Sequence, residues 1–340
     1  MASPFVESAK SGLRVLGESI SAFYVRLQAQ AYNDQVIDLD EVEELHFAFY
    51  GEFGYGLQSW IPYVNFIKSR FEGKVVTYGP PGSSPFYYFS DVHREVAPDH
   101  STMTFGALQN YAALVKKFAL KKLFFPSNQT RRDISIGDYR WMNHQSRGVL
   151  DVETNYKPLE LSGTLKNQLG IDSPYVVVNN KNYFNWGNVG IENFFAPTEL
   201  YSFAEKLKDR GKIMVYNAMP LPADSENIYF DQEVDFGEHD NVVDMRSVYE
   251  DEQGLTARNK IQIDLLKNAE CTVAVQGGNA VLSLVCGTDT HVLMRGGFDY
   301  PYYLGLKKAY GVMCECFYQP GHLFQHVLAE KCLGLGDAAE

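Results

Sequence analysis

The residues best suited to hold a ligand lie in the stretch Cys271–Asn279, which reads Cys-Thr-Val-Ala-Val-Gln-Gly-Gly-Asn. Its apolar, β-branched first half predicts a buried strand, and Gly277 and Gly278 predict a sharp turn whose backbone can approach a ligand. Asn279 is expected to cap the helix that follows. Because a helix N-terminus presents N–H groups and partial positive charge, this turn is a candidate seat for a phosphate. The alternative is a tight turn between strand and helix with no ligand.

Two cationic side chains are expected at the same edge of the sheet. Lys181 follows the predicted strand that ends in Asn179 and Asn180, and Arg295 follows a strand ending at Met294. Both side chains can neutralise a diphosphate, and arginine offers a fork of donors that matches phosphate oxygens. Because the carboxyl ends of parallel strands share one edge, these residues are predicted to converge on the glycine turn. Taken singly, each could be an ordinary solvated side chain.

A second glycine loop, Gly51–Gly56, follows the first predicted strand of the chain. Its spacing, G-x-x-G-x-G, is not the dinucleotide fingerprint, so it does not predict an NAD site. Glu52 in this loop is a candidate general base, and Asp91 and His93 are the other candidates. The sequence does not rank the three. A surface role for Glu52 and a structural role for His93 are the competing interpretations.

Two patterns raise the question of a metal, and neither predicts one. Asp38-Leu-Asp40 has the D-x-D form, but it lies in an acidic linker and is interpreted as solvated charge. Cys314 and Cys316 alternate onto one face of a strand, with His322 and His326 one helical turn apart downstream. Structural zinc sites usually separate paired cysteines by two to four residues, and only one residue separates these. No metal is therefore expected.

The element pattern predicts an α/β fold built from two doubly wound, Rossmann-like domains that face a cleft. Strand-like and helix-like segments alternate along the chain, which is typical of parallel sheets. The length of 340 residues also favours two cores over one. The predicted parts are an N-terminal helix and linker at 1–43, an α/β domain at 44–160 and a second α/β domain at 172–340.

The expected elements can be given as ranges. The predicted strands are 45–50, 74–78, 175–179, 212–216, 271–275, 291–294 and 311–314. The predicted helices are 5–32, 58–71, 105–120, 197–209, 258–268, 278–286 and 323–331.

Composition narrows the class of partner. The net charge of −12 argues against nucleic-acid binding, which normally needs a basic face. No apolar run is long enough to span a bilayer, and the first residues lack the features of a signal peptide. Five scattered cysteines, an odd number, suggest reduced thiols. The expected location is the cytoplasm, which would be the host cytoplasm if the protein is viral.

Four segments resemble a known group of enzymes. Glu52–Tyr63, Tyr78–Ser83, Tyr175–Trp186 and Val275–Ala280 are similar to sugar-nucleotide glycosyltransferases of the GT-B architecture. Members are encoded by bacteria and by large DNA viruses, including chlorella-type viruses of algae. The chain lacks the H-x-R-R-x-D element of the GT-B fucosyltransferases, to which Asp91–Glu95 is only loosely similar, so a GDP-fucose donor is not predicted.

The resemblance implies an activity and a division of labour between the domains. The C-terminal half would bind a UDP- or GDP-linked sugar, and the N-terminal half a glycan or glycoprotein acceptor. No other cofactor or metal is implied, and the enzyme would be a hexosyl- or pentosyltransferase. The residues expected at the donor are Asn180, Lys181, Gln276, Gly277, Gly278, Asn279 and Arg295. Those expected near the transferred sugar are Gly54, Tyr55, Gly56 and Gln58.

Two alternative functions stay open at this point. A polysaccharide pyruvyl transferase shares the two-domain plan but uses phosphoenolpyruvate as its donor. A non-catalytic protein could retain the cleft for binding a sugar or a nucleotide. The sequence contains no pattern that predicts an oligomeric state.

Overall fold

A computed structural model provides the structure of the protein. It describes residues 42–51, 53–69, 71–99, 105–121, 123–125, 135–136, 159, 169, 171, 174–180, 194–218, 234–251, 254–295 and 300–329. The predicted helix at 5–32, the acidic linker, Glu52 and Lys181 lie outside these ranges.

The N-terminal half forms a parallel sheet in the order β3-β2-β1-β4-β5. Its strands are β1 (Glu44–Ala48), β2 (Lys74–Gly79), β3 (Val92–Glu95), β4 (Phe124–Phe125) and β5 (Ser135–Ile136). Its helical segments are α2 (Phe53–Tyr55), a π-helix (Gly56–Trp60), α3 (Ile61–Lys68), a 3₁₀ turn (Ser84–Tyr87) and α4 (Phe105–Lys117). Strand β1 is the middle strand of this sheet, and its apolar side chains are buried, as expected for a strand covered on both faces.

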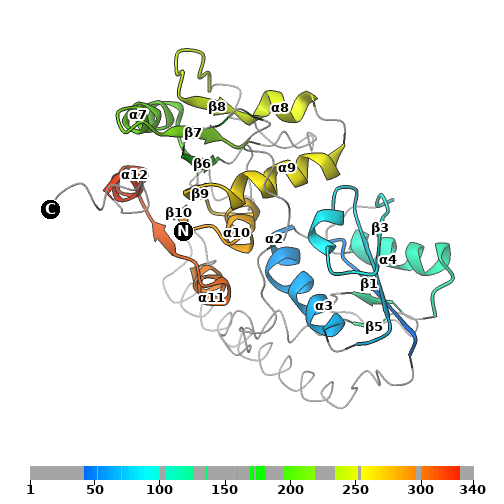
Figure 1. Ribbon diagram of the computed structural model, residues 1–340. Helices are drawn as coiled ribbons and strands as arrows, with labels where there is room; N and C mark the ends of the chain where they lie inside the picture. The colour runs from blue at the N-terminus through cyan, green and yellow to red at the C-terminus, as the bar shows by residue number, and fades with distance from the viewer. Residues whose placement is uncertain are drawn as a thin grey trace, which may run out of the picture.

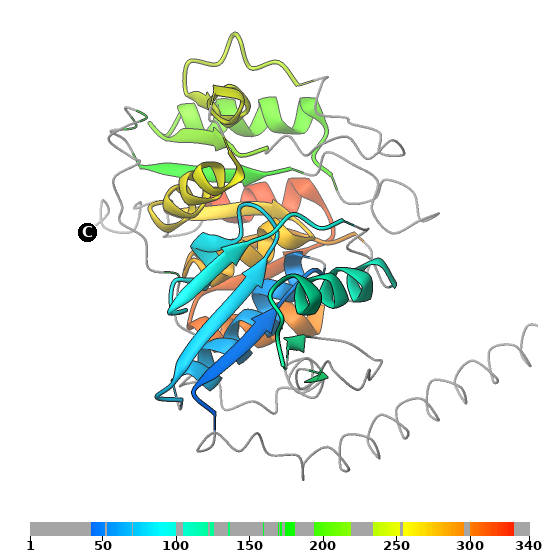
Figure 2. The same cartoon turned by 90° about the vertical axis from the view of Figure 1, so that its right-hand side faces the viewer.

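The C-terminal half forms a second parallel sheet in the order β11-β10-β9-β6-β7-β8. Its strands are β6 (Tyr175–Asn179), β7 (Ile213–Tyr216), β8 (Val242–Asp244), β9 (Cys271–Val275), β10 (Thr290–Leu293) and β11 (Cys314–Phe317). Its helices are α7 (Pro197–Lys208), α8 (Met245–Asp251), α9 (Leu255–Lys267), α10 (Gly278–Val285), α11 (Tyr300–Tyr310) and α12 (Pro320–Ala329). Figure 2 shows the two sheets, with the N-terminal one in blue to cyan.

Both sheets reverse their strand order at one point, which confirms the predicted α/β class of two doubly wound sheets. The reversals fall between β1 and β4 and between β6 and β9. Ligands of such sheets bind beyond the carboxyl ends of the strands at these switch points. The strands fall within the predicted segments 44–160 and 172–340, whose boundaries stay a prediction.

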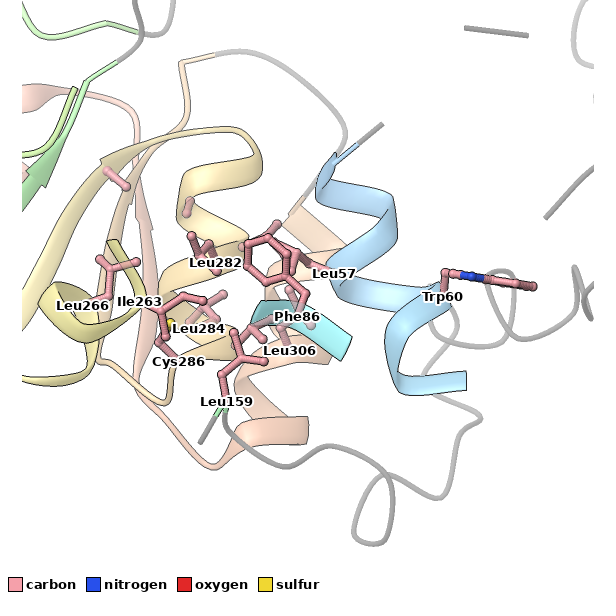
Figure 3. Packing of buried hydrophobic residues seen from close by; sticks show 14 of the residues in the cluster. Leu57, Trp60, Phe86, Leu159, Ile263, Leu266, Leu282, Leu284, Cys286 and Leu306 are labelled. Atoms are coloured by element: carbon pink, nitrogen blue, oxygen red, sulfur yellow. The ribbon is translucent and has the colours of Figure 1, made fainter. Parts of the chain in front are cut away.

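One apolar core joins the two halves. Helix α10 packs on α2 and the π-helix of the N-terminal half (Figure 1). In the close view of Figure 3, Leu57 and Phe86 from the N-terminal half meet Leu282 of α10 and Ile263 of α9. All four side chains are almost fully buried. The apolar contact between the halves is therefore part of the folded core rather than a solvated joint.

Polar contacts fix a second junction between the halves. Asn259 of α9 donates a hydrogen bond of 2.7 Å to the carbonyl oxygen of Gly82. Thr256 of the same helix donates to both carboxylate oxygens of Glu95, at 2.9 and 3.1 Å. The turn after β2 and the end of β3 are thus bound to a helix of the other sheet.

Several predicted elements differ in detail from the structure. The glycine loop is helical from Phe53 onward, and both of its helical segments pack on α10. The helix after β9 begins at Gly278 with Gly277 in the capping position, so the predicted cap at Asn279 is wrong. The last strand spans Cys314–Phe317 instead of 311–314. Strands β3, β4, β5 and β8 and helices α8 and α11 were not predicted. No described helix combines the length and apolar character needed to cross a bilayer.

The turn at Gly82 generates a stability prediction. Its φ is +89°, and a β-carbon placed there would lie 2.6 Å from the β-carbon of Leu255 in α9. The variant Gly82→Ala combines backbone strain with a clash between the halves, so we expect it to lower the free energy of unfolding by about 2–4 kcal/mol. Urea-induced unfolding measures this loss.

A matched variant separates the two causes. Gly211 also has a positive φ, +65°, but a β-carbon there meets no atom within 4 Å. Gly211→Ala should cost only the backbone strain, about 1–2 kcal/mol. Equal losses in the two variants would contradict the close packing of Gly82 against α9.

Candidate functional site

The two predicted glycine segments meet between the sheets. A β-carbon added to Gly278 would lie 3.1 Å from Cδ1 of Phe53 and 3.6 Å from the backbone nitrogen of Gly54. The start of α10, at the carboxyl end of β9, therefore lies against the loop at the carboxyl end of β1. This brings together Gly54, which was predicted on the sugar side, and Gly278, which was predicted on the donor side; their roles stay predictions.

Gly277 gives the start of α10 its shape. Its φ of +147° and ψ of −169° belong to a region that is essentially restricted to glycine. Its N–H donates a 3.0 Å hydrogen bond to the Tyr303 hydroxyl of α11, which fixes the turn. The first intrahelical bond runs from Val281 to the carbonyl of Gly277. The backbone N–H groups of residues 278–280 therefore point out of the helix, the arrangement that binds anions.

A buried network of polar side chains lies behind this turn. Asn217 at the end of β7 donates a 2.6 Å bond to Asn179 at the end of β6, and Tyr249 of α8 donates to Asn217. Asn179 in turn donates to Ser283 of α10 at 3.3 Å. These groups are nearly inaccessible to water, so their mutual bonds hold α10 in place relative to the switch point. Asn217, Tyr249 and Ser283 were not among the predicted residues.

Asn180, a predicted donor residue, has a backbone-holding role in the structure. Its side chain exchanges hydrogen bonds of 2.9 and 3.0 Å with the backbone of Phe195 and also donates to the Tyr216 hydroxyl. It therefore fixes the chain that leads into α7. Gln276 is buried directly before the glycine turn, at the carboxyl end of β9, which is one of the two strands at the switch point.

Arg295 lies at the carboxyl end of β10, on the predicted edge of the sheet. Its guanidinium stands 3.6 Å from Glu199 at the start of α7 and 5.9 Å from the ring centre of Phe194. The side chain remains 31% accessible. Glu199 also accepts a 2.8 Å bond from the N–H of Ala196, so it is held in place as an acid beside the arginine. The guanidinium of Arg295 is thus held beside Glu199 and is still partly accessible to solvent.

A cavity of about 140 Å³ opens beside the glycine loop of the N-terminal half. Its walls include Gly51, Phe53 and Gly56 from that loop, the turn 80–83 after β2, and Asn259 from the other half. A cavity of about 150 Å³ is large enough for one six-membered ring. Most of its wall is apolar, so the cavity suits the face of a ring better than a charged group.

Gly56 and Gln58 of the predicted sugar side lie in the π-helix that follows the loop. Gly56 lies so close to Phe49 that a β-carbon there would approach the ring to 2.7 Å, and Gln58 is buried. Tyr55 belongs to α2, and its side chain is outside the described part. Short π-helices commonly occur at functional sites because they widen the helix and displace side chains.

His93 supports the wall of this cavity. Its Nε2 lies 2.9 Å from the Ser83 hydroxyl and its Nδ1 lies 2.8 Å from the Thr77 hydroxyl. Because Ser83 donates its own proton to the carbonyl of Pro80, the imidazole must donate from Nε2 and accept at Nδ1. The ring also stacks on Tyr87, with centres 4.7 Å apart. Both ring nitrogens are occupied, so His93 positions the turn and has no lone pair available for a substrate.

Burial lowers the pKa of His93 to about 4, and the negative charge of Glu95 offsets this only in part. The ring is therefore neutral at physiological pH, as the deduced hydrogen bonds require. The predicted structural role of His93 agrees with this geometry.

Asp91 lies at the opposite edge of the sheet from the glycine loop. It precedes β3, accepts a 2.7 Å bond from the N–H of Val75 and pairs with Lys68 at 2.6 Å. These contacts, the Lys68 bond foremost, lower the pKa of the Asp91 carboxyl. The structure therefore does not bring Asp91 to the cavity or to the start of α10.

The chain matches no family model and no curated protein. Solved structures do resemble it. The E. coli ADP-heptose LPS heptosyltransferase II has a TM-score of 0.58 and 10% identity, covering 87% of this chain and all of that chain (100%). A glycosyl transferase of family 9 from Veillonella parvula has a TM-score of 0.57 and 8% identity, covering 84% and 89%. E. coli heptosyltransferase WaaC with ADP-2-deoxy-2-fluoro heptose has a TM-score of 0.51 and 10% identity, covering 86% and 96%.

These likenesses establish the fold. The chain has the predicted GT-B architecture, with two doubly wound sheets whose carboxyl edges face each other. At identities near a tenth they establish no family and no activity. The viral or bacterial origin and the cytoplasmic location stay predictions.

The neutral state of His93 generates a pH prediction. The unfolded histidine binds its proton near pH 6.5 and the folded one only near pH 4. As the pH drops, the unfolded chain takes up this proton first. The contribution of His93 to the free energy of unfolding therefore falls below pH 6.5 and levels off below about pH 4. Lowering the pH from about 7.5 to about 5 should cost about 2 kcal/mol through this group. Urea unfolding at the two pH values measures it.

Two variants assign that loss to His93. In His93→Gln the pH-dependent loss should shrink by about that 2 kcal/mol, because glutamine does not titrate. His322→Gln, at an exposed position of α12, should keep the full pH dependence. If His93→Gln loses as much unfolding free energy between the two pH values as the unmodified protein does, the His93 ring is not held neutral.

Proposed function

We propose that this protein is a glycosyltransferase that moves a sugar from a nucleotide-sugar donor to a hydroxyl group of a glycan acceptor. The observation that carries the proposal is the meeting of the α10 N-terminus with the glycine loop of the other sheet. A diphosphate bound at the N-terminus of α10 would place its attached sugar toward the glycine loop. Enzymes with this architecture are named heptosyltransferases and family 9 glycosyl transferases.

The donor diphosphate would be held by backbone and by arginine. The outward N–H groups at the start of α10 suit phosphate oxygens, and Arg295 lies beside Glu199, partly accessible, at the end of the next strand. As the bond to the sugar breaks, negative charge grows on the leaving diphosphate. Fixed N–H donors and a cation at that point lower the barrier without a metal ion. Lys181 is proposed as a further cation at this site.

Glu52 is the proposed general base. It stands in the sequence between Gly51 and Phe53, both of which line the cavity. Of the three predicted bases, His93 has both nitrogens occupied and Asp91 is at the far edge of the sheet. A base would take the proton of the attacking acceptor hydroxyl in an inverting transfer.

The acceptor is proposed to enter by the cavity of the N-terminal half. Its apolar wall, with Phe53, Phe86 and Tyr87, suits the face of a sugar ring. Asn259 and the turn after β2 supply polar groups at the rim.

The first experiment identifies the donor class. Melting temperatures are measured with ADP, UDP, GDP, CMP, their sugar derivatives and phosphoenolpyruvate, because a ligand of the folded state raises the melting temperature. We expect one nucleoside diphosphate and its sugar to raise it. A rise with phosphoenolpyruvate alone would replace the proposal with pyruvyl transfer, and no rise with any of them would contradict it.

The role of Glu52 is tested by Glu52→Gln. Removing the base should lower kcat by about 10²- to 10⁴-fold and leave the affinity for the donor unchanged. Steady-state rates and donor titration measure the two. Asp91→Asn provides the matched control and should retain kcat. Unimpaired turnover in Glu52→Gln would remove it as the base.

The role of Arg295 is tested by Arg295→Gln. Loss of a charge-assisted contact to the diphosphate should weaken donor binding by about tenfold or more. Lys308→Gln, an exposed position on α11, should not change donor binding.

Added Mg²⁺ or Mn²⁺ should leave the turnover of the protein unchanged. Strict dependence of turnover on either ion would contradict a metal-independent transfer.

A further inference from the structure

Three metal-ligating side chains from three elements converge at the edge of the C-terminal sheet. His291 of β10 lies directly beside Glu315 of β11 in the parallel register. His326 of α12 approaches both, with its Nε2 at 2.8 Å from a Glu315 oxygen and its ring centre 5.4 Å from that of His291. One ligand atom from each of the three lies within 4.8 Å of the other two. No comparable group of three occurs elsewhere in the described ranges.

We infer that His291, Glu315 and His326 form a binding site for one divalent transition-metal ion, with zinc the best match. Two imidazoles and one carboxylate are a ligand set that zinc uses, with a fourth position left to water. Zinc bonds of about 2.0–2.2 Å draw their ligands to within about 3.5 Å of one another, so modest side-chain rotations close this site.

The burial of the three residues suits such a site. His291 is fully buried, so it provides a fixed point in the sheet. The side chains of Glu315 and His326 are 39% and 31% accessible, so an ion can enter from solvent and keep a water ligand. Without metal, Glu315 and His326 can form an ion pair, which the bound ion would replace with two bonds to itself.

The cysteines that suggested a zinc site in the sequence belong to the other face of the same strand. Glu315 lies between Cys314 and Cys316, so alternation turns its side chain away from both. Cys314 packs in the apolar cluster with Tyr303 and Leu306 of α11. His326 is on α12, which packs against the opposite face (Figure 1). The histidine that the sequence paired with the cysteines therefore pairs with the residue between them.

The position of this site separates it from the proposed transfer and favours a role in holding the sheet together. His291 and Glu315 each lie one residue after the start of their strands, while the proposed donor binds beyond the strand ends. An ion there would tie the edge strand β11 and the helix α12 to the inner strand β10. Binding to the folded state alone would raise the stability of the protein by mass action.

The test uses the full chain without an affinity tag, stripped with chelator and dialysed against Zn²⁺. Metal analysis should find one zinc per chain, and added Zn²⁺ should raise the melting temperature, whereas Mg²⁺ should do neither. Glu315→Gln and His326→Ala change partly exposed positions and should fold. Each should weaken zinc binding by more than about tenfold, the least that loss even of a supporting residue costs.

Two controls and a spectrum make the assignment specific. His322→Ala lies in the same helix at an exposed position and should bind zinc normally, as should Cys316→Ser. The Co²⁺-loaded protein should show absorption of nitrogen and oxygen ligation without a thiolate charge-transfer band. Absence of bound zinc would overturn the inference, as would binding that survives both Glu315→Gln and His326→Ala. Loss on Cys316→Ser would assign the ion to the cysteines instead.

Discussion

The close approach of α10 to the N-terminal half is the contact on which the rest of the arrangement depends. Gly278 has no side chain, so its backbone can lie close to Phe53 and Gly54. A β-carbon at this position would already lie 3.1 Å from Cδ1 of Phe53. Because α10 begins at the switch point of one sheet and the glycine loop follows the switch point of the other, this contact sets the two ligand-binding edges face to face. A β-carbon at position 278 would press on the Phe53 ring, so packing favours glycine here, whereas the turn itself depends on Gly277.

The polar groups behind α10 show how a buried site can be made rigid. Asn179, Asn217, Tyr249 and Ser283 each lose water on folding, and their bonds to one another compensate for that loss. The network connects the ends of two strands to two helices. The result is an N-terminus whose N–H groups are held before any ligand arrives, which is the condition for electrostatic stabilisation of a developing charge.

Sequence reasoning succeeded where burial dominates. The strands Tyr175–Asn179 and Cys271–Val275 were predicted at their observed bounds because runs buried on both faces are continuously apolar. It failed at β3, whose residues Val92–Glu95 are half exposed and mostly polar. Since that strand was missed, nothing indicated that Asp91 precedes it and Glu95 ends it, at opposite edges of the sheet. The capping residue was also missed, because Asn279 is a favourable cap by type and only the conformation of Gly277 excludes it.

The shared core has a consequence for how the molecule loses its structure. Leu57 and Phe86 of one half are buried against Ile263 and Leu282 of the other, so neither sheet can separate without exposing apolar surface of both. The two halves therefore act as one thermodynamic unit, and heat should unfold them in a single calorimetric transition. If the two halves move to exchange ligands, they have to slide along this core, because swinging apart would expose it.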